Sequence, residues 1–102
     1  MRIEETPEAT RLVQLAEEAS ELAHAALKLA RILMDVSPTP VSEQDARRNL
    51  REEVADVIVC EKALGISESD PDIASMRRKK LWRWQQRLDE EAQECWWKKR
   101  QN

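Results

Sequence analysis

The sequence predicts an all-α protein, and three features of its composition and periodicity lead to that prediction. Ala, Leu, Glu, Lys, Gln and Arg, the best helix formers, dominate the 102 residues. The chain has one Gly, four Pro and no Phe or Tyr, whereas strands and their turns favour aromatic residues and Gly. Apolar residues recur every three or four positions, which is the spacing of one helix face. We therefore expect an antiparallel helical bundle that forms a single domain over residues 1–102.

The first predicted helix begins at Thr6-Pro7-Glu8. Thr suits the cap, Pro the first helical position, and Glu the positive end of the helix dipole. Segment 35–40 ends the helix, because its two prolines cannot continue one. The expected apolar stripe consists of Leu12, Leu15, Ala19, Leu22, Ala26, Leu29 and Leu33.

Two further helices follow the proline segment. Ser42 with Asp45 is a capping-box-like start of the second helix, and Gly65 ends it. The third helix runs from about Asp72 to Lys98. The apolar faces are Ala46, Leu50, Val54, Val57 and Leu64 on the second helix, and Ala74, Leu81, Trp84, Leu88 and Ala92 on the third. Three helices seldom enclose a full core, so we expect a partner subunit, in a homodimer or homotetramer, to complete it.

Charge and hydropathy exclude several classes of protein. Charged residues make up 36% of the chain and the mean hydropathy is −0.72, so we expect no membrane-spanning helix. The N-terminus lacks the apolar segment of a secretory signal, and the two cysteines lie far apart, which favours reduced thiols in a cytoplasmic protein. Residues 1–75 carry a net charge of −8 and residues 76–102 one of +5. The acidic part argues against nucleic-acid binding over the whole surface.

One internal repeat concentrates acidic residues at matching helix positions. The segment from Leu15 to Leu22 aligns with the segment from Leu50 to Val57, at an offset of 35 residues. The alignment pairs Glu17 with Glu52, Glu18 with Glu53, and Glu21 with Asp56. At about 100° per residue, Glu18 lies about 60° and Glu21 about 120° from Leu15, on one flank of the apolar stripe. Glu53 and Asp56 take the same angles from Leu50.

Antiparallel packing of the two helices would bring both acidic pairs to one place. Four converging carboxylates repel one another and raise one another's pKa unless a cation lies between them. Mg²⁺, a hard cation that prefers oxygen ligands, suits them best. The alternative is that these acids are solvated, as acids on surface helices usually are, but matched pairs on two helices favour a functional site.

The same residues resemble a family signature. Glu17-Glu18-x-x-Glu21 followed by Glu53-x-x-Asp56 is similar to the motif of the MazG-like all-α nucleoside triphosphate pyrophosphohydrolases. The resemblance implies that Glu18, Glu21, Glu53 and Asp56 bind Mg²⁺, with Mn²⁺ as an alternative. It also implies hydrolysis of a (d)NTP to a (d)NMP and pyrophosphate, as in the cleaning of nucleotide pools. Glu17, Glu18 and Glu52 are candidates to orient the attacking water, with Glu18 first. The chain departs from the family pattern in two ways: its linker between the motifs is long and proline-rich, and Glu61 falls on the apolar face of the second helix. Glu61 is either an extra metal ligand or a polar contact between subunits.

The third predicted helix carries cations beside its apolar stripe. Lys80, Arg83 and Arg87 occupy the flank that the acids occupy on the other two helices. The run from Lys80 to Leu88 resembles the basic helix of phage and Firmicutes MazG-like proteins, which implies contacts with the phosphates of the substrate. The alternative is that these cations pair with nearby acids on their own helix or extend over a subunit interface.

The tryptophans and the single histidine receive weaker assignments. Trp84 lies on the apolar stripe and is expected in the core, whereas Trp82 lies opposite, at an interface or as a stacking surface for a base. The basic, Trp-rich tail over residues 93–102 contacts a neighbouring subunit or, less favoured, stacks on nucleic acid. His24 follows Glu21 by three residues and has no assigned catalytic role.

Two other functions remain open at this point. The first is a non-catalytic helical interaction or regulatory protein, with solvated acids and a partner on the basic C-terminal helix. The second is a carboxylate-bridged di-iron bundle, which needs Glu-x-x-His pairs that His24 alone cannot supply. With one Gly, the chain has no glycine-rich phosphate loop. The enzyme requires the four acids to converge and bind Mg²⁺, whereas the interaction protein does not, so this feature distinguishes the two functions.

Overall fold

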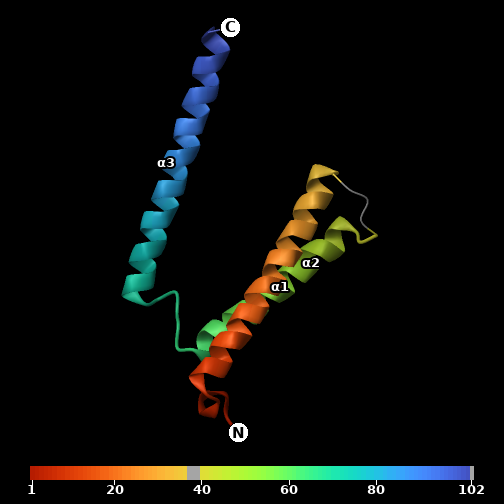
Figure 1. Ribbon diagram of the computed structural model, residues 1–102, viewed down its shortest axis with the longest axis vertical. Coiled ribbons are helices and arrows are strands. Elements are labelled where there is room, and N and C mark those ends of the chain that lie inside the picture. The colour runs from red at the N-terminus through yellow and green to blue at the C-terminus, as the bar shows by residue number, and fades with distance from the viewer. Residues whose placement is uncertain (37–39, 102) are drawn as a thin grey trace. The chain divides into compact units, whose positions relative to one another are not determined.

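The chain is helical in a computed structural model that describes residues 1–36 and 40–101. A short 3₁₀ helix, η1 (Ile3–Glu5), precedes three long helices, α1 (Glu8–Met34), α2 (Glu43–Ala63) and α3 (Pro71–Gln101) (Figure 1). The described residues contain no strand, which confirms the predicted all-α class. The chain divides into two compact units, Met1–Ile66 and Ser67–Asn102, each described by itself below. The single domain over residues 1–102 stays a prediction.

The start of α1 differs from the prediction by one residue. Pro7 occupies the N-cap position without a side-chain hydrogen bond, and the first helical residue is Glu8. The Thr6 hydroxyl instead donates to the carbonyl oxygen of Ile3 at 2.6 Å. The predicted Thr6 cap is therefore wrong, because this side chain already closes the preceding 3₁₀ turn.

Helices α1 and α2 each end at a residue with a left-handed backbone conformation. Asp35, with φ of 53°, donates its N–H to Ile32 at the end of α1. The predicted helix-ending residues Ser37, Pro38 and Thr39 lie outside the described residues. At the end of α2, Gly65 has φ of 72° and donates to Lys62, while Ile66 donates to Glu61. This pair of bonds is a Schellman motif, and it confirms the predicted Gly65 stop.

The start of α2 is also as predicted. Ser42 is the N-cap, and its hydroxyl accepts a hydrogen bond from the backbone N–H of Asp45 at 3.1 Å. This bond satisfies one of the amide groups that a helix leaves unpaired in its first turn.

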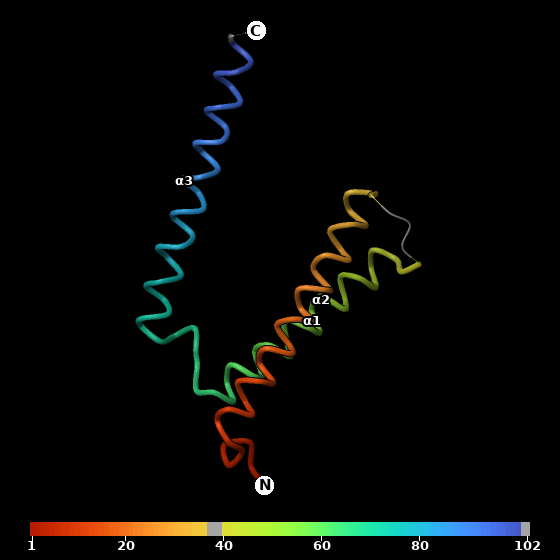
Figure 2. Tube along the Cα trace, viewed as in Figure 1, coloured from red at the N-terminus to blue at the C-terminus, as the bar shows by residue number. Residues whose placement is uncertain are grey.

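Helices α1 and α2 form an antiparallel hairpin (Figure 2). The guanidinium of Arg11, near the start of α1, donates to the carbonyl oxygen of Ala63, at the end of α2. A cation at this position also interacts favourably with the negative end of the helix dipole. Arg11 thus joins the two open ends of the hairpin.

The seam between the helices contains only part of each predicted stripe, and it adds residues that were not predicted to lie there. On α1 the least exposed side chains are Ala25 and Leu29, and Leu15 and Leu22 are half-buried in the same row. On α2 they are Ala46 and Cys60, with Leu50 and Val57 half-buried between them. Predicted stripe members that lie outside the seam, and are exposed, include Leu12, Ala19, Ala26 and Leu33 on α1 and Val54 on α2.

The third helix forms the second unit. The Asp70 carboxylate accepts from the backbone N–H groups of Asp72 and Ile73, so it caps α3 at its start. Trp84 is 59% exposed, and Leu81 and Leu88 are also exposed. A unit built on one helix has no second face to bury Trp84, so its predicted place in a core shared with a partner subunit stays a prediction. No helix of the described residues is long and apolar enough to cross a membrane.

A candidate metal centre between two helices

Two acidic residues lie in the seam of the hairpin. On α1, Glu18 lies between Leu15 and Leu22 in the row of side chains that faces α2. On α2, Glu53 lies between Leu50 and Val57 in the row that faces α1. Both acids are half-buried. Because the helices run antiparallel, these two positions oppose each other near the middle of the hairpin.

Three carboxylates meet at this point. One carboxylate oxygen from each of Glu18, Glu53 and Asp56 lies within 4.8 Å of the other two. Asp56 is exposed and lies one turn after Glu53 on α2, so the cluster opens to solvent on its side. Oxygen ligands of Mg²⁺ lie about 2.1 Å from the ion, so two of them are separated by at most about 4.2 Å. Small side-chain movements would therefore bring all three oxygens to one hard cation.

The charges of the cluster act on its members. Desolvation raises the pKa of Glu53 above its ordinary value, and the charges of Asp56 and Glu18 raise that pKa further, followed by those of Glu21 and Glu52. Burial raises the pKa of the Cys60 thiol, and the charges of Glu18 and Asp56 add to that rise. A cation between the carboxylates would relieve this repulsion. Exposed acids are common without a metal, but a pair of acids in an apolar seam is not.

The structure brings together three of the four predicted metal ligands. The fourth, Glu21, is exposed and lies outside the cluster, although its charge reaches Glu53. Glu17 and Glu52 are exposed, and the charge of Glu52 also reaches Glu53. Glu21 as a ligand, and Glu17 and Glu52 as water-orienting groups, stay predictions.

Gln14 is a residue of this site that the sequence analysis missed. Its side-chain amide donates to Oε1 of Glu18 at 2.9 Å. The bond holds the carboxylate from the preceding turn of α1. The signal for it was the spacing of four residues, at which helical side chains are neighbours.

His24 and Glu61 lie elsewhere in this unit, and both predicted roles of Glu61 stay open. His24 is exposed on α1. Glu61 is half-buried on α2, and its backbone carbonyl accepts from Leu64 and Ile66 in the turn that ends the helix.

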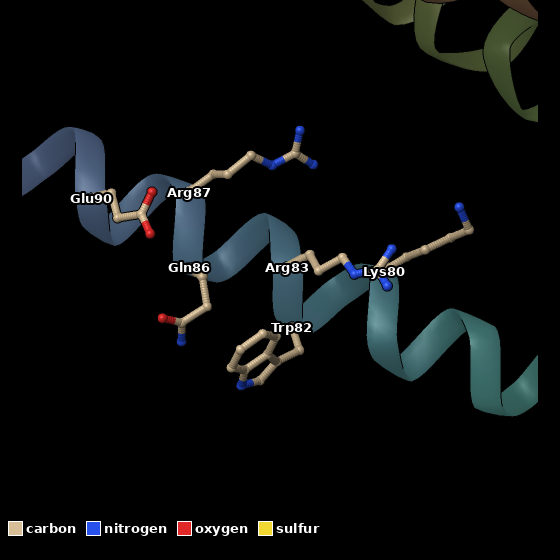
Figure 3. A pocket seen from close by; sticks show the side chains of 6 residues that line it. All are labelled: Lys80, Trp82, Arg83, Gln86, Arg87 and Glu90. Atoms are coloured by element: carbon tan, nitrogen blue, oxygen red, sulfur yellow. The ribbon is translucent and has the colours of Figure 1, made fainter.

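The predicted phosphate-binding cations gather on one part of α3. Lys80 and Arg87 extend from one side of the helix and Arg83 extends along it toward Lys80, whereas Trp82 points away on the opposite side (Figure 3). With Gln86 and Glu90 they line an open depression of about 540 Å³ formed by α3 alone. None of the three cations forms an ion pair within the described part of their own helix.

The basic tail holds a local contact. The guanidinium of Arg100 lies over the Trp96 ring, 4.4 Å from its centroid. The spacing of four residues makes this a cation–π pair along one helix face. Trp96 and Trp97 remain more than half exposed.

No protein-family model, no curated protein and no solved structure matches this chain. The resemblance of the motif residues to the MazG-like family therefore stays a prediction.

Proposed function

We propose that the chain is a Mg²⁺-dependent nucleoside triphosphate pyrophosphohydrolase with a MazG-like helical bundle. The observation that carries the proposal is the convergence of Glu18, Glu53 and Asp56 from two antiparallel helices. An all-oxygen ligand set of this kind suits a hard divalent cation. Mn²⁺ is the alternative metal.

In this proposal the acidic cluster holds the metal and one acid directs water. Glu18, Glu53 and Asp56, joined by Glu21, supply the ligands. The bound ion neutralises phosphate charge and lowers the pKa of a coordinated water. Glu18 is the first candidate to orient that water, because Gln14 fixes its carboxylate; Glu17 and Glu52 are the others. Addition of water across the α–β phosphoanhydride releases a nucleoside monophosphate and pyrophosphate, without a covalent enzyme intermediate.

The basic flank of α3 has a role in the same reaction. We assign Lys80, Arg83 and Arg87 to the phosphate oxygens, where their charges would offset the charge of the departing pyrophosphate. Trp82 is assigned to a subunit interface or to a nucleobase. The reaction belongs to the cytoplasm, where it would clean the nucleotide pool.

We also propose that the active form is a homodimer or homotetramer. The hairpin buries few large side chains and leaves Leu12, Leu33, Val54 and Ile58 between 40% and 55% exposed. Burial of such side chains in a subunit interface would supply the apolar area that one chain lacks.

A non-catalytic interaction protein is the second candidate. The exposed Leu81, Trp84 and Leu88 on a strongly basic helix favour it. In that case the partner binds α3 and the acidic cluster needs no metal.

Pyrophosphate release separates the two candidates. The wild type is assayed on a panel of NTPs and dNTPs with Mg²⁺, beside Glu53→Gln and a matched control, Glu8→Gln, which changes an exposed acid outside the cluster. We expect pyrophosphate and monophosphate from the wild type and the control. Glu53→Gln should lose about 100-fold or more in kcat/KM, because loss of a residue that merely supports a metal ligand already costs about 10- to 100-fold. An inert wild type that also fails to bind Mg²⁺ leaves the interaction protein as the function.

A further inference from the structure

A second cavity lies beside the acidic cluster, at the open end of the hairpin. It has a volume of about 290 Å³ and is formed by the N-terminal segment, the first turns of α1 and the last turns of α2. Ile3, Val59 and Ala63 supply apolar walls, together with the buried Cys60. Thr10 and Arg11 supply polar groups. The size is at the lower limit for small-molecule pockets, which suits one flat ring system.

Arg11 gives this cavity an under-used donor. A guanidinium carries five N–H groups, yet the one hydrogen bond of this side chain among the described residues goes to the carbonyl of Ala63. Its Nε is buried and has no acceptor among the described residues, so a ligand in the cavity would meet the outer N–H groups of the guanidinium. Buried polar groups are almost always paired in native proteins. A ligand with a carbonyl oxygen would therefore gain from a guanidinium whose donors are not satisfied by the protein.

Two residues connect the cavity with the acidic cluster. Gln14 lines the cavity and also donates to Glu18. Cys60 lines it too, and the charges of Glu18 and Asp56 act on its thiol. Gln14 precedes Glu18 by four residues, which is about 6 Å along the axis of α1. A molecule with phosphates at the cluster could place its other end in the cavity.

We propose that this cavity receives the nucleobase of the substrate and prefers bases with a ring carbonyl, an inference that rests on the proposed function. Cytosine, uracil, thymine and guanine carry such an oxygen and adenine does not. Thr10 and Arg11 are then specificity-determining residues, and the apolar walls cover the faces of the ring. A site that hydrogen-bonds one substrate group discriminates strongly against analogues that lack the group.

Kinetics with and without a base test the proposal. Thr10→Phe fills the cavity from α1, and Ser20→Phe is the matched control on the exposed surface of the same helix; circular dichroism checks that both fold. Inorganic tripolyphosphate serves as a substrate without a base. We expect Thr10→Phe to raise KM for the preferred nucleotide about tenfold or more and to leave tripolyphosphate hydrolysis and the control unchanged. Adenine nucleotides should be the poorest substrates. An equal effect of Thr10→Phe on both substrates, or none on either, would overturn the proposal while the enzyme activity stands.

A second measurement covers the case of an inert protein. Cytidine, uridine, guanosine and adenosine, free of phosphate and metal, are titrated against the ¹⁵N-labelled protein. We expect cytidine, uridine and guanosine to change the amide chemical shifts of Thr10 and Ala63 in the wild type. In Thr10→Phe these nucleosides should change no amide shifts at the cavity. Shifts without turnover mean that the proposed reaction is wrong and the base site is right. Absence of these shifts at millimolar nucleoside would contradict the base site whatever the activity.

Discussion

Glu53 is the residue that matters most for the electrostatics of the hairpin. It lies in a row of apolar side chains, it is half-buried, and four other acids raise its pKa. Such a group makes the folded chain bind its proton more tightly than the unfolded chain does. The cost of ionising it in the fold is the physical reason to expect a cation in this place.

The pH dependence of stability follows from this raised pKa. The ordinary pKa of a Glu side chain is 4.5. Below that pH, Glu53 is protonated in both the folded and the unfolded chain and does not destabilise the fold. As the pH rises through the folded pKa, the folded state resists losing the proton and stability falls. We expect Glu53→Gln to raise the melting temperature near neutral pH and to have little effect near pH 4, in metal-free buffer. An equal effect at both pH values, seen by thermal denaturation, would show that the change acts through packing.

Mg²⁺ should reverse that pH effect. A ligand at 100 times its Kd stabilises the folded state by about 2.7 kcal/mol. For a domain of this size that amounts to a rise of roughly 10 to 20 °C in melting temperature. We expect such a rise in the wild type and in Glu8→Gln, and none in Glu53→Gln. A rise of similar size in all three proteins would place the metal elsewhere.

At the scale of elements, the hairpin depends on a seam in which few residues are fully buried. Leu29 is 7% exposed in this seam, whereas Leu27 on the same helix is 52% exposed. Leu29→Ala should therefore cost about 2 to 4 kcal/mol of unfolding free energy, and Leu27→Ala less than about 1 kcal/mol. Chemical denaturation measures both. Equal costs would mean that the seam follows another stripe of α1.

The end of α2 gives a backbone prediction. Gly65 has φ of 72°, and a Cβ atom there would meet nothing within 4 Å. Gly65→Ala therefore costs backbone strain alone, about 1 to 2 kcal/mol. Asp35→Gly, at the left-handed end of α1, removes such strain, so we expect it to stabilise the fold. A neutral Gly65→Ala in chemical denaturation would contradict the left-handed turn.

The sequence predicted the helices better than it predicted their contact faces. Ser42 and Gly65 give local signals, because capping depends on neighbouring residues alone. The seam depends on the partner helix, and α1 offers two adjacent apolar stripes. One contains Leu15, Leu22 and Leu29, and the other contains Leu12 and Leu33. Periodicity could not choose between them, so Glu18 was predicted on a flank of the stripe, whereas the structure places it in the seam.

At the scale of the whole molecule, the described residues form two helical units with little buried apolar area in either. A chain that buries so little apolar area needs additional burial to be stable. The candidate site was accessible from the sequence because its acids repeat at a fixed offset. Cys60 and the cavity were not, since they become neighbours of the acids only in the packed hairpin.

Self-association is the prediction that belongs to this scale. We expect light scattering after size-exclusion chromatography to give the mass of a dimer or tetramer. Ile58→Glu, on the exposed apolar side of α2, should shift the mass toward the monomer, and Val13→Glu, which lies about 100° around α1 from Leu12, should not. A monomeric wild type at micromolar concentration would contradict the proposed subunit interface.

Calorimetric titration with Mg²⁺ tests the central claim most directly, because it examines the three carboxylates without any assumption about the substrate. We expect binding at the acidic cluster in the wild type and in Glu8→Gln, and loss of that binding in Glu53→Gln. Binding that persists in Glu53→Gln, or no binding in the wild type, would contradict a metal centre between α1 and α2.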